Sequence, residues 1–470
     1  MNFRLLLVHS TWVSVTLAIV FPTFASAATP PKPQNTSSTV QVPDYLNPNP
    51  NPLQFPTKPE EVRIQGTVPV TLTQVLELAR RNNRDLQVAI LQLERSRSAL
   101  RESQAALFPT LGINSNITNS GNGFARSRSQ ASTSYTGSAQ LNYDLYNSGN
   151  RQATIQAAEE QLRVDQLNVE TQSSTISLNA TTQYYDLQQA DEQVRINRAA
   201  VANAQASLRD TQAREQAGVG TRFDVLQAQV NLANAQQELT NAISQQQIAR
   251  RQLATTLSLS ESVDITAADP VQLAGLWPQT LEESIVRAFQ NRPELQQQLA
   301  QRNIYEQQRR QALSQLGPQI SLVGSYNLLD RYDDGVSVTD GYSAGLQGTL
   351  SLFDGGAARA RAAQSRANIA IAESQFGSQR DLIRFDVEQY YSQLQSNLNN
   401  VQTSSVALNQ AREALNLARL RFQAGVGTQT EVIAAENDLT RAEGNRVTAI
   451  LDYNRALANL QRSVTSRASR

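Results

Sequence analysis

Apolar residues recur every seven positions along two long segments of the chain, residues 150–216 and 356–423. In each segment the repeat advances once by four residues and then resumes. A sustained seven-residue repeat predicts coiled-coil helices, and a four-residue insertion locally unwinds the supercoil. The repeating positions are Ile155, Leu162, Val169, Ile176, Ala180, Leu187, Val194, Val201 and Leu208 in the first segment, and Ala362, Ile369, Phe376, Ile383, Val387, Leu394, Val401, Leu408 and Leu415 in the second.

Both segments shift their register at the same place, and this favours a wall of helices held side by side. At 1.5 Å per residue each helix would be about 100 Å long. A solid coiled-coil rod is the alternative that the periodicity leaves open.

Four shorter segments alternate between apolar and polar residues instead. They lie near residues 111–118, 135–145, 320–328 and 342–352. Such segments, about ten residues long and with aromatic residues near their ends, are typical of transmembrane β-barrel strands. The residues predicted to face lipid are Tyr135, Leu141, Tyr143, Leu322, Tyr326, Leu346 and Leu350.

The polar loops around residues 121–123 and 333–335 would then lie outside the cell. An edge of a soluble β-sandwich is the alternative for these strands. Four strands cannot close a barrel, for which about eight are needed. The chain must therefore oligomerise if the strands enter lipid.

The second half of the body repeats the first. Leu72 returns 209 positions later as Leu281, and the hexapeptide Gln-Ala-Gly-Val-Gly-Thr at 216–221 returns unchanged at 423–428. Each copy predicts a helix of about 35 residues that ends at a proline, two strands, the long helix, a glycine turn and another helix of about 35 residues. The first helix is predicted at 73–107 and 281–316, and the last at 223–257 and 430–464.

The start of the chain has the features of an export signal. An apolar run over residues 5–24 precedes Ala25-Ser26-Ala27, a small-residue cleavage site, although a retained anchor would share the apolar run. Residues 30–59 hold nine of the 16 prolines and predict an extended, solvated arm. The predicted regions are a signal peptide (1–27), a Pro-rich arm (28–69), a first repeat (70–258), an irregular joint (259–278) and a second repeat (279–465).

The composition argues against an enzyme. The chain has no Cys, its one His is His9 in the predicted signal peptide, and its only lysines are Lys32 and Lys58. These absences exclude Ser-His-Asp and Cys-His catalysis, a usual zinc site, a Schiff-base lysine and a GxxxxGK[ST] phosphate loop in the folded body. Two-carboxylate chemistry remains open, but no paired acidic motif supports it. We expect no cofactor and no metal.

Charge is balanced, with 41 basic and 41 acidic residues. A basic surface for nucleic acid is therefore not expected.

The duplicated order of strands and helices resembles the TolC-type outer membrane efflux proteins over residues 70–465. Local marks of the resemblance are the strand-to-helix junctions at 145–149 and 352–356 and the Arg-Phe-x-x-Gly pattern that begins at Arg421. The resemblance implies an α+β membrane protein: a homotrimeric outer-membrane β-barrel, continued by an α-helical barrel in the periplasm. It also implies docking on a periplasmic adaptor and on an inner-membrane pump or ABC transporter, for efflux or type I secretion.

The same resemblance assigns two kinds of site. Glu431 matches an acidic position of the periplasmic constriction, and Asp224 matches a residue of the closing lock, although the residues that would hold Asp224 are replaced here by Phe422 and Gly427. The glycine turns match the tips that meet the adaptor. The tip residues are Gly218, Val219, Gly220, Thr221, Gly425, Val426, Gly427 and Thr428.

Each site residue also has a purely structural interpretation. A tight turn between helices would by itself require the glycines. Thr221 with Asp224, and Thr428 with Glu431, fit a T-x-x-[DE] capping box at a helix start. For the whole chain, the alternative function is a periplasmic coiled-coil adaptor, which would share the hairpins but lack strands with an apolar face.

Overall fold

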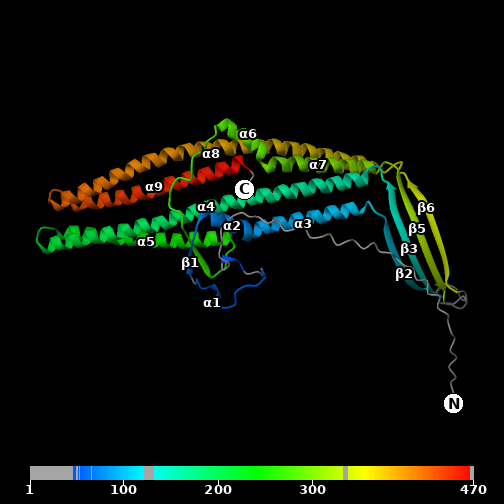
Figure 1. The fold of residues 1–470 in the computed structure, drawn as a ribbon, viewed down its shortest axis with the longest axis horizontal. Helices are drawn as coiled ribbons and strands as arrows, with labels where there is room; N and C mark the ends of the chain where they lie inside the picture. The colour runs from blue at the N-terminus through cyan, green and yellow to red at the C-terminus, as the bar shows by residue number, and fades with distance from the viewer. Residues whose placement is uncertain are drawn as a thin grey trace, which may run out of the picture. The chain divides into compact units, whose positions relative to one another are not determined.

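Each repeat folds as two short helices, two strands, one long helix and a final helix (Figure 1). The computed structural model describes residues 46–48, 51, 53–64, 66–120, 132–331 and 337–465, which belong to the unit Val42–Arg470. The predicted signal peptide and both predicted extracellular loops lie outside the described residues. The first repeat contains α2 (Leu72–Asn82), α3 (Arg84–Ala105), β2 (Thr110–Ser120), β3 (Ser132–Tyr146), α4 (Asn150–Gln216) and α5 (Arg222–Thr256).

The second repeat has the same elements in the same order. They are α6 (Leu281–Asn291), α7 (Pro293–Ser314), β5 (Gln319–Arg331), β6 (Thr339–Thr349), α8 (Ala357–Gln423) and α9 (Gln429–Val464). Three short elements lie outside the two sets, namely α1 (Pro59–Val62), β1 (Gly66–Val70) and β4 (Val263–Ala267). No helix in the described part of the chain is long and apolar enough to cross a membrane.

The long helices have the predicted bounds to within one residue and bury the predicted face. Both are 67 residues long, and each begins after a glycine with positive φ, Gly149 or Gly356. The residues on either side of the four-residue shift are fully or almost fully buried in both copies. They are Ile176 and Ala180 in α4, and Ile383 and Val387 in α8. The heptad positions therefore form the packing face of each long helix.

The first predicted helix of each repeat is in fact two helices. The break falls at Asn83 between α2 and α3, and at Arg292 between α6 and α7, where the backbone is extended. Asn83 ends α2 and also starts α3, because its side chain accepts a hydrogen bond from the Leu86 backbone N–H at 3.1 Å. In the second repeat Pro293 follows the break and disfavours a helical conformation at Arg292.

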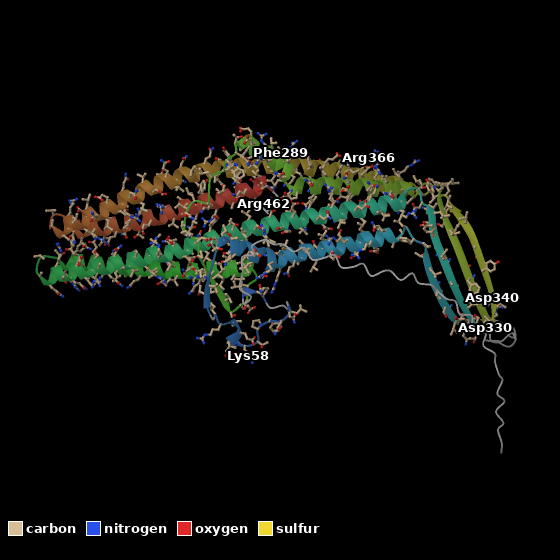
Figure 2. The ribbon with its side chains drawn as sticks, viewed as in Figure 1. Lys58, Phe289, Asp330, Asp340, Arg366 and Arg462 are labelled. Carbon is tan, nitrogen blue, oxygen red and sulfur yellow. The ribbon has the colours of Figure 1, made fainter. Side chains whose placement is uncertain are left out.

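The four long strands form one antiparallel sheet in the order β2-β3-β5-β6, so β3 and β5 join the two repeats. Every residue of β2 and of β6 is exposed. These two outer strands have no neighbour on their far side in the sheet of the described chain. Asp330 and Asp340 lie at the end of the sheet away from the helices (Figure 2).

The joint between the repeats is more ordered than predicted. Its residues Val263–Ala267 form β4, which pairs in parallel with β1. Asp269 accepts hydrogen bonds from the Tyr184 hydroxyl (2.7 Å) and from the Leu72 backbone N–H (2.8 Å). Burial and the Asp269 carboxylate raise the pKa of the Tyr184 phenol. The joint is thus fastened to α4 and to the start of α2.

Part of the Pro-rich arm is packed rather than solvated. Leu46 is 1% exposed and belongs to the apolar cluster that contains Val70 of β1 and Ile265 of β4. The expectation of a solvated arm holds for Leu53 and Phe55, which are largely exposed. Burial of Leu46 removes apolar surface from water, and this favours packing of that part of the arm against the core.

Candidate functional site

The two helix–turn–helix tips have the same backbone geometry. Gly218 and Gly425 adopt φ of 72° and 75°. In the first tip the Val219 and Gly220 backbone N–H groups both donate to the Arg214 carbonyl at 3.0 Å. In the second tip Val426 and Gly427 donate to the Arg421 carbonyl at the same distance. This left-handed glycine closes each long helix in the way a C-terminal glycine cap does.

The second glycine of each tip is required for a different reason. A Cβ on Gly220 would lie 2.9 Å from Arg214 Cβ, and one on Gly427 would lie 3.0 Å from Arg421 Cβ. Only glycine fits at this approach. The valine between the glycines is exposed in both tips: Val219 by 72% and Val426 by 70%. Each turn therefore exposes one apolar side chain to solvent.

The two candidate gate carboxylates have different surroundings. Asp224 forms a full capping box with Thr221, accepting from its backbone N–H at 3.2 Å and its hydroxyl at 2.6 Å. In the second tip Thr428 Oγ1 accepts from the Glu431 backbone N–H at 3.3 Å. The Glu431 carboxylate lies instead 3.7 Å from Arg421 Nη1, and its side chain is 43% exposed. Asp224 thus acts as a helix cap, whereas the Glu431 carboxylate faces solvent.

A contact that the sequence did not indicate joins the two tips. Arg214, in the last turn of α4, donates from Nη2 to the Phe422 carbonyl at 2.8 Å and to the Gln423 carbonyl at 3.2 Å. Its guanidinium carbon lies 4.2 Å from the centre of the Phe422 ring. The arginine thereby satisfies two carbonyls at the end of α8 and makes a cation–π contact.

Further polar contacts join the hairpins above the tips. Gln429 Nε2 donates to Ser207 Oγ at 2.7 Å, and both residues are buried. Arg419 bridges Asn203 Oδ1 (3.1 Å) and Glu436 Oε1 (3.0 Å). Burial raises the pKa of Glu436, although the Arg419 guanidinium acts to lower it. The heptad positions gave no sign of this polar layer, because its residues lie beside the apolar face.

The sheet brings most of the predicted lipid-facing residues onto one face. Directly opposed pairs are Tyr143 with Leu322, Leu322 with Leu346, and Leu141 with Leu111, and residues opposite each other point to the same side. Tyr135 and Tyr326 lie on this face too, because they are an even number of residues from Leu141 and Leu322. Leu350 does not belong to the strand, since β6 ends at Thr349.

The fold and its tips define a class: a duplicated unit of antiparallel strands and very long helices, of the kind found in outer-membrane export channels. The family model for outer membrane efflux proteins matches residues 75–258 and 284–465. The chain belongs to the outer membrane efflux protein family, and the predicted α+β membrane fold and outer-membrane location are confirmed. The match supports the channel over the periplasmic adaptor.

Individual relatives agree with this assignment. The chain is 22% identical to outer membrane protein TolC of Escherichia coli over 412 residues, covering 81% of this chain and 79% of TolC. It is 25% identical to outer membrane protein OprJ of Pseudomonas aeruginosa over 421 residues, covering 83% and 84%. The crystal structure of VceC from Vibrio cholerae superposes with a TM-score of 0.71 at 19% identity, covering 84% and 95%.

The sheet generates a prediction about its two faces. Leu141 lies on the apolar face and Asn142 on the opposite one. If the apolar face contacts lipid, Leu141→Arg should lower the free energy of unfolding by about 2–4 kcal/mol near the bilayer midplane, and Asn142→Arg should lower it far less. Denaturant titration of the protein in lipid vesicles measures both values. Equal losses would contradict this assignment of the two faces.

Proposed function

We propose that three copies of this chain form an outer-membrane duct that passes substrates from an inner-membrane transporter to the exterior. The sheet carries the argument. Its outer strands β2 and β6 are exposed along their full length, so their edge N–H and C=O groups require a partner in lipid. Three copies of a four-stranded sheet give about 12 strands, enough to close a barrel, whereas one copy is too few.

The assembly prediction is direct. The protein extracted in detergent should be a homotrimer of C3 symmetry, because the β6 edge of one copy must meet the β2 edge of the next until the ring closes. Native mass spectrometry, or light scattering corrected for bound detergent, gives the number of chains. A stable monomer or dimer as the export-competent species would contradict the proposal.

The tips are the proposed docking sites for a periplasmic adaptor, which links the duct to a pump of a tripartite efflux system or to an ABC transporter in type I secretion. The support is the repeated geometry of 218–221 and 425–428, where a rigid turn presents one exposed valine. Such a duct can pass either small molecules or proteins, because it needs no tight binding site.

Docking can be tested without disturbing the turns. Val219→Asp combined with Val426→Asp should abolish export, since both side chains are exposed and their replacement alters only the surface offered to the adaptor. Drug susceptibility or secretion by cells measures the loss, with trimers in the outer membrane as a check on assembly. Val230→Asp is a matched control, because Val230 is also exposed, on α5, away from the turn. Normal export by the double variant would leave the tips with only a folding role.

We propose Glu431 as a residue of the periplasmic constriction. Its carboxylate is not used in the helix cap, and threefold symmetry would bring three copies together. Carboxylates that converge in a narrow passage attract cations.

The corresponding prediction concerns ion selectivity. Glu431→Gln should reduce the cation preference of the channel and weaken its block by multivalent cations, since a charge is lost while the backbone N–H still donates to Thr428. Asp224→Asn should have a smaller effect, because the Asp224 carboxylate is bound in its capping box. Reversal potentials in planar bilayers compare the three proteins. An unchanged potential in Glu431→Gln would remove Glu431 from the pore.

A further inference from the structure

The two repeats have different neighbours. Helix α7 packs between α4 and α8, whereas α3 packs against α4. The difference is visible at equivalent positions 209 residues apart: Ala300 of α7 is 2% exposed, and Leu91 of α3 is 68% exposed. One face of α3 and one face of α8 therefore lack the contact that α7 and α4 make with each other.

We propose that α8 of one copy and α3 of the next pack as α4 and α7 do within the chain, with the larger side chain moved to the opposite helix at one pair of positions and a charged pair in place of a neutral one at another. This inference rests on the proposed trimer and specifies how its copies meet. The correspondence is fixed by the bounds of the helices. Asn150–Gln216 and Ala357–Gln423 are equal in length and 207 positions apart, and Arg84–Ala105 and Pro293–Ser314 are equal in length and 209 apart.

At the junction between strands and helices, the larger residue of the facing pair lies on opposite helices in the two seams. Within the chain, Ser148 has a φ of 51° and donates from Oγ to the Pro318 carbonyl at 2.7 Å. A Cβ on the facing Gly317 would lie 2.2 Å from Ser148 Oγ and 2.6 Å from Ser148 Cβ, so the serine fits only because a glycine is opposite.

The equivalent positions in the other seam hold the reverse pair. Gly355 takes the place of Ser148, with a φ of 68° and open space where a Cβ would be. Phe108 takes the place of Gly317 and is 69% exposed. Within the chain, the absence of a side chain on Gly317 leaves space for Ser148. Between copies, the absence of a side chain on Gly355 would leave space for Phe108 of the next copy. The exposed ring thereby gains an apolar contact in the assembly.

About two helical turns further along, a neutral pair within the chain corresponds to a charged pair in the proposed seam. Within the chain Gln311 Nε2 donates to Thr154 Oγ1 at 2.9 Å. The residues at the equivalent positions are Glu102 and Arg361, which carry opposite charges. Arg361 uses one donor on Gln315 of its own chain, at 2.6 Å, and its guanidinium has five N–H donors in all. The neutral hydrogen bond of the inner seam becomes an ion pair between copies.

The sheet follows the same rule. Pairing of Ala139 with Tyr326 and of Tyr143 with Leu322 within the chain corresponds to Leu346 with Ile117, and Leu350 with Ile113, of the next copy. Strand β3 continues to Tyr146 where β5 pairs with it, whereas β6, which has no neighbour on its outer edge in the described chain, ends at Thr349. The register between copies restores Leu350 to the strand.

Placing the Ser–Gly pair of the α4–α7 seam into the proposed α8–α3 seam tests the exchange of side-chain size. Gly355→Ser should lower the temperature at which the trimer dissociates, because the new side chain meets Phe108 of the next copy. A serine at this positive φ is also strained, but the strain is present in both the single and the double variant, so it does not account for a rescue. Adding Phe108→Gly should raise that temperature again, although Phe108→Gly alone lowers it, and this reversal is the mark of a direct contact. Arg361→Glu with Glu102→Arg is the corresponding comparison for charge.

A second measurement does not depend on these variants folding well. The chain has no cysteine, so Ile117→Cys combined with Leu346→Cys places one thiol on each predicted edge. Oxidation should link the copies into covalent trimers, and neither single variant should give them. If the wild-type protein is a trimer but the variants show neither rescue nor cross-linking, the seam is overturned and the proposed duct stands. A wild-type protein that is not a trimer would overturn both.

Discussion

Backbone hydrogen bonding at the two edges of the sheet is the constraint on which the rest of the structure depends. The outer strands β2 and β6 leave a row of N–H and C=O groups without a partner in the sheet of one chain. In hydrocarbon each such group costs several kcal/mol, and no water is present to replace the bond. A four-stranded sheet is therefore stable in lipid only as part of a closed ring.

The strength of packing changes along the long helices. Large apolar clusters fasten the two repeats near the joint, and they extend along α4 to Ile196 and along α8 to Val401. Beyond these residues the hairpins meet through polar pairs such as Gln429 with Ser207. A typical hydrogen bond contributes only about 1 kcal/mol net, because water can replace it. Separating the hairpins near their tips would therefore cost less than separating them near the joint, where the apolar clusters lie.

Local signals in the sequence were sufficient for most of the fold. The bounds of the long helices were predictable because glycines with positive φ stand at both ends, and the heptads identified the packing face. The break at Asn83 was missed because the apolar pattern runs through it without a proline. Strand β4 and the contact of Arg214 with Phe422 were missed for a different reason: each depends on a segment about 200 residues away, which no local pattern reports.

Duplication explains where the two halves are alike and where they differ. The tip hexapeptides are identical because each closes the same kind of helix in the same way, so the same φ and the same lack of room act on both. Arg214 and Arg421 occupy equivalent positions in the two repeats but make different contacts. Arg214 donates to carbonyls of α8, whereas Arg421 lies beside Glu431 of its own hairpin. Positions with the same surroundings in both repeats hold the same residue. Positions whose neighbours within the chain differ, such as Ser148 and Gly355, hold different residues, and such differences lie on the surfaces proposed to meet another copy.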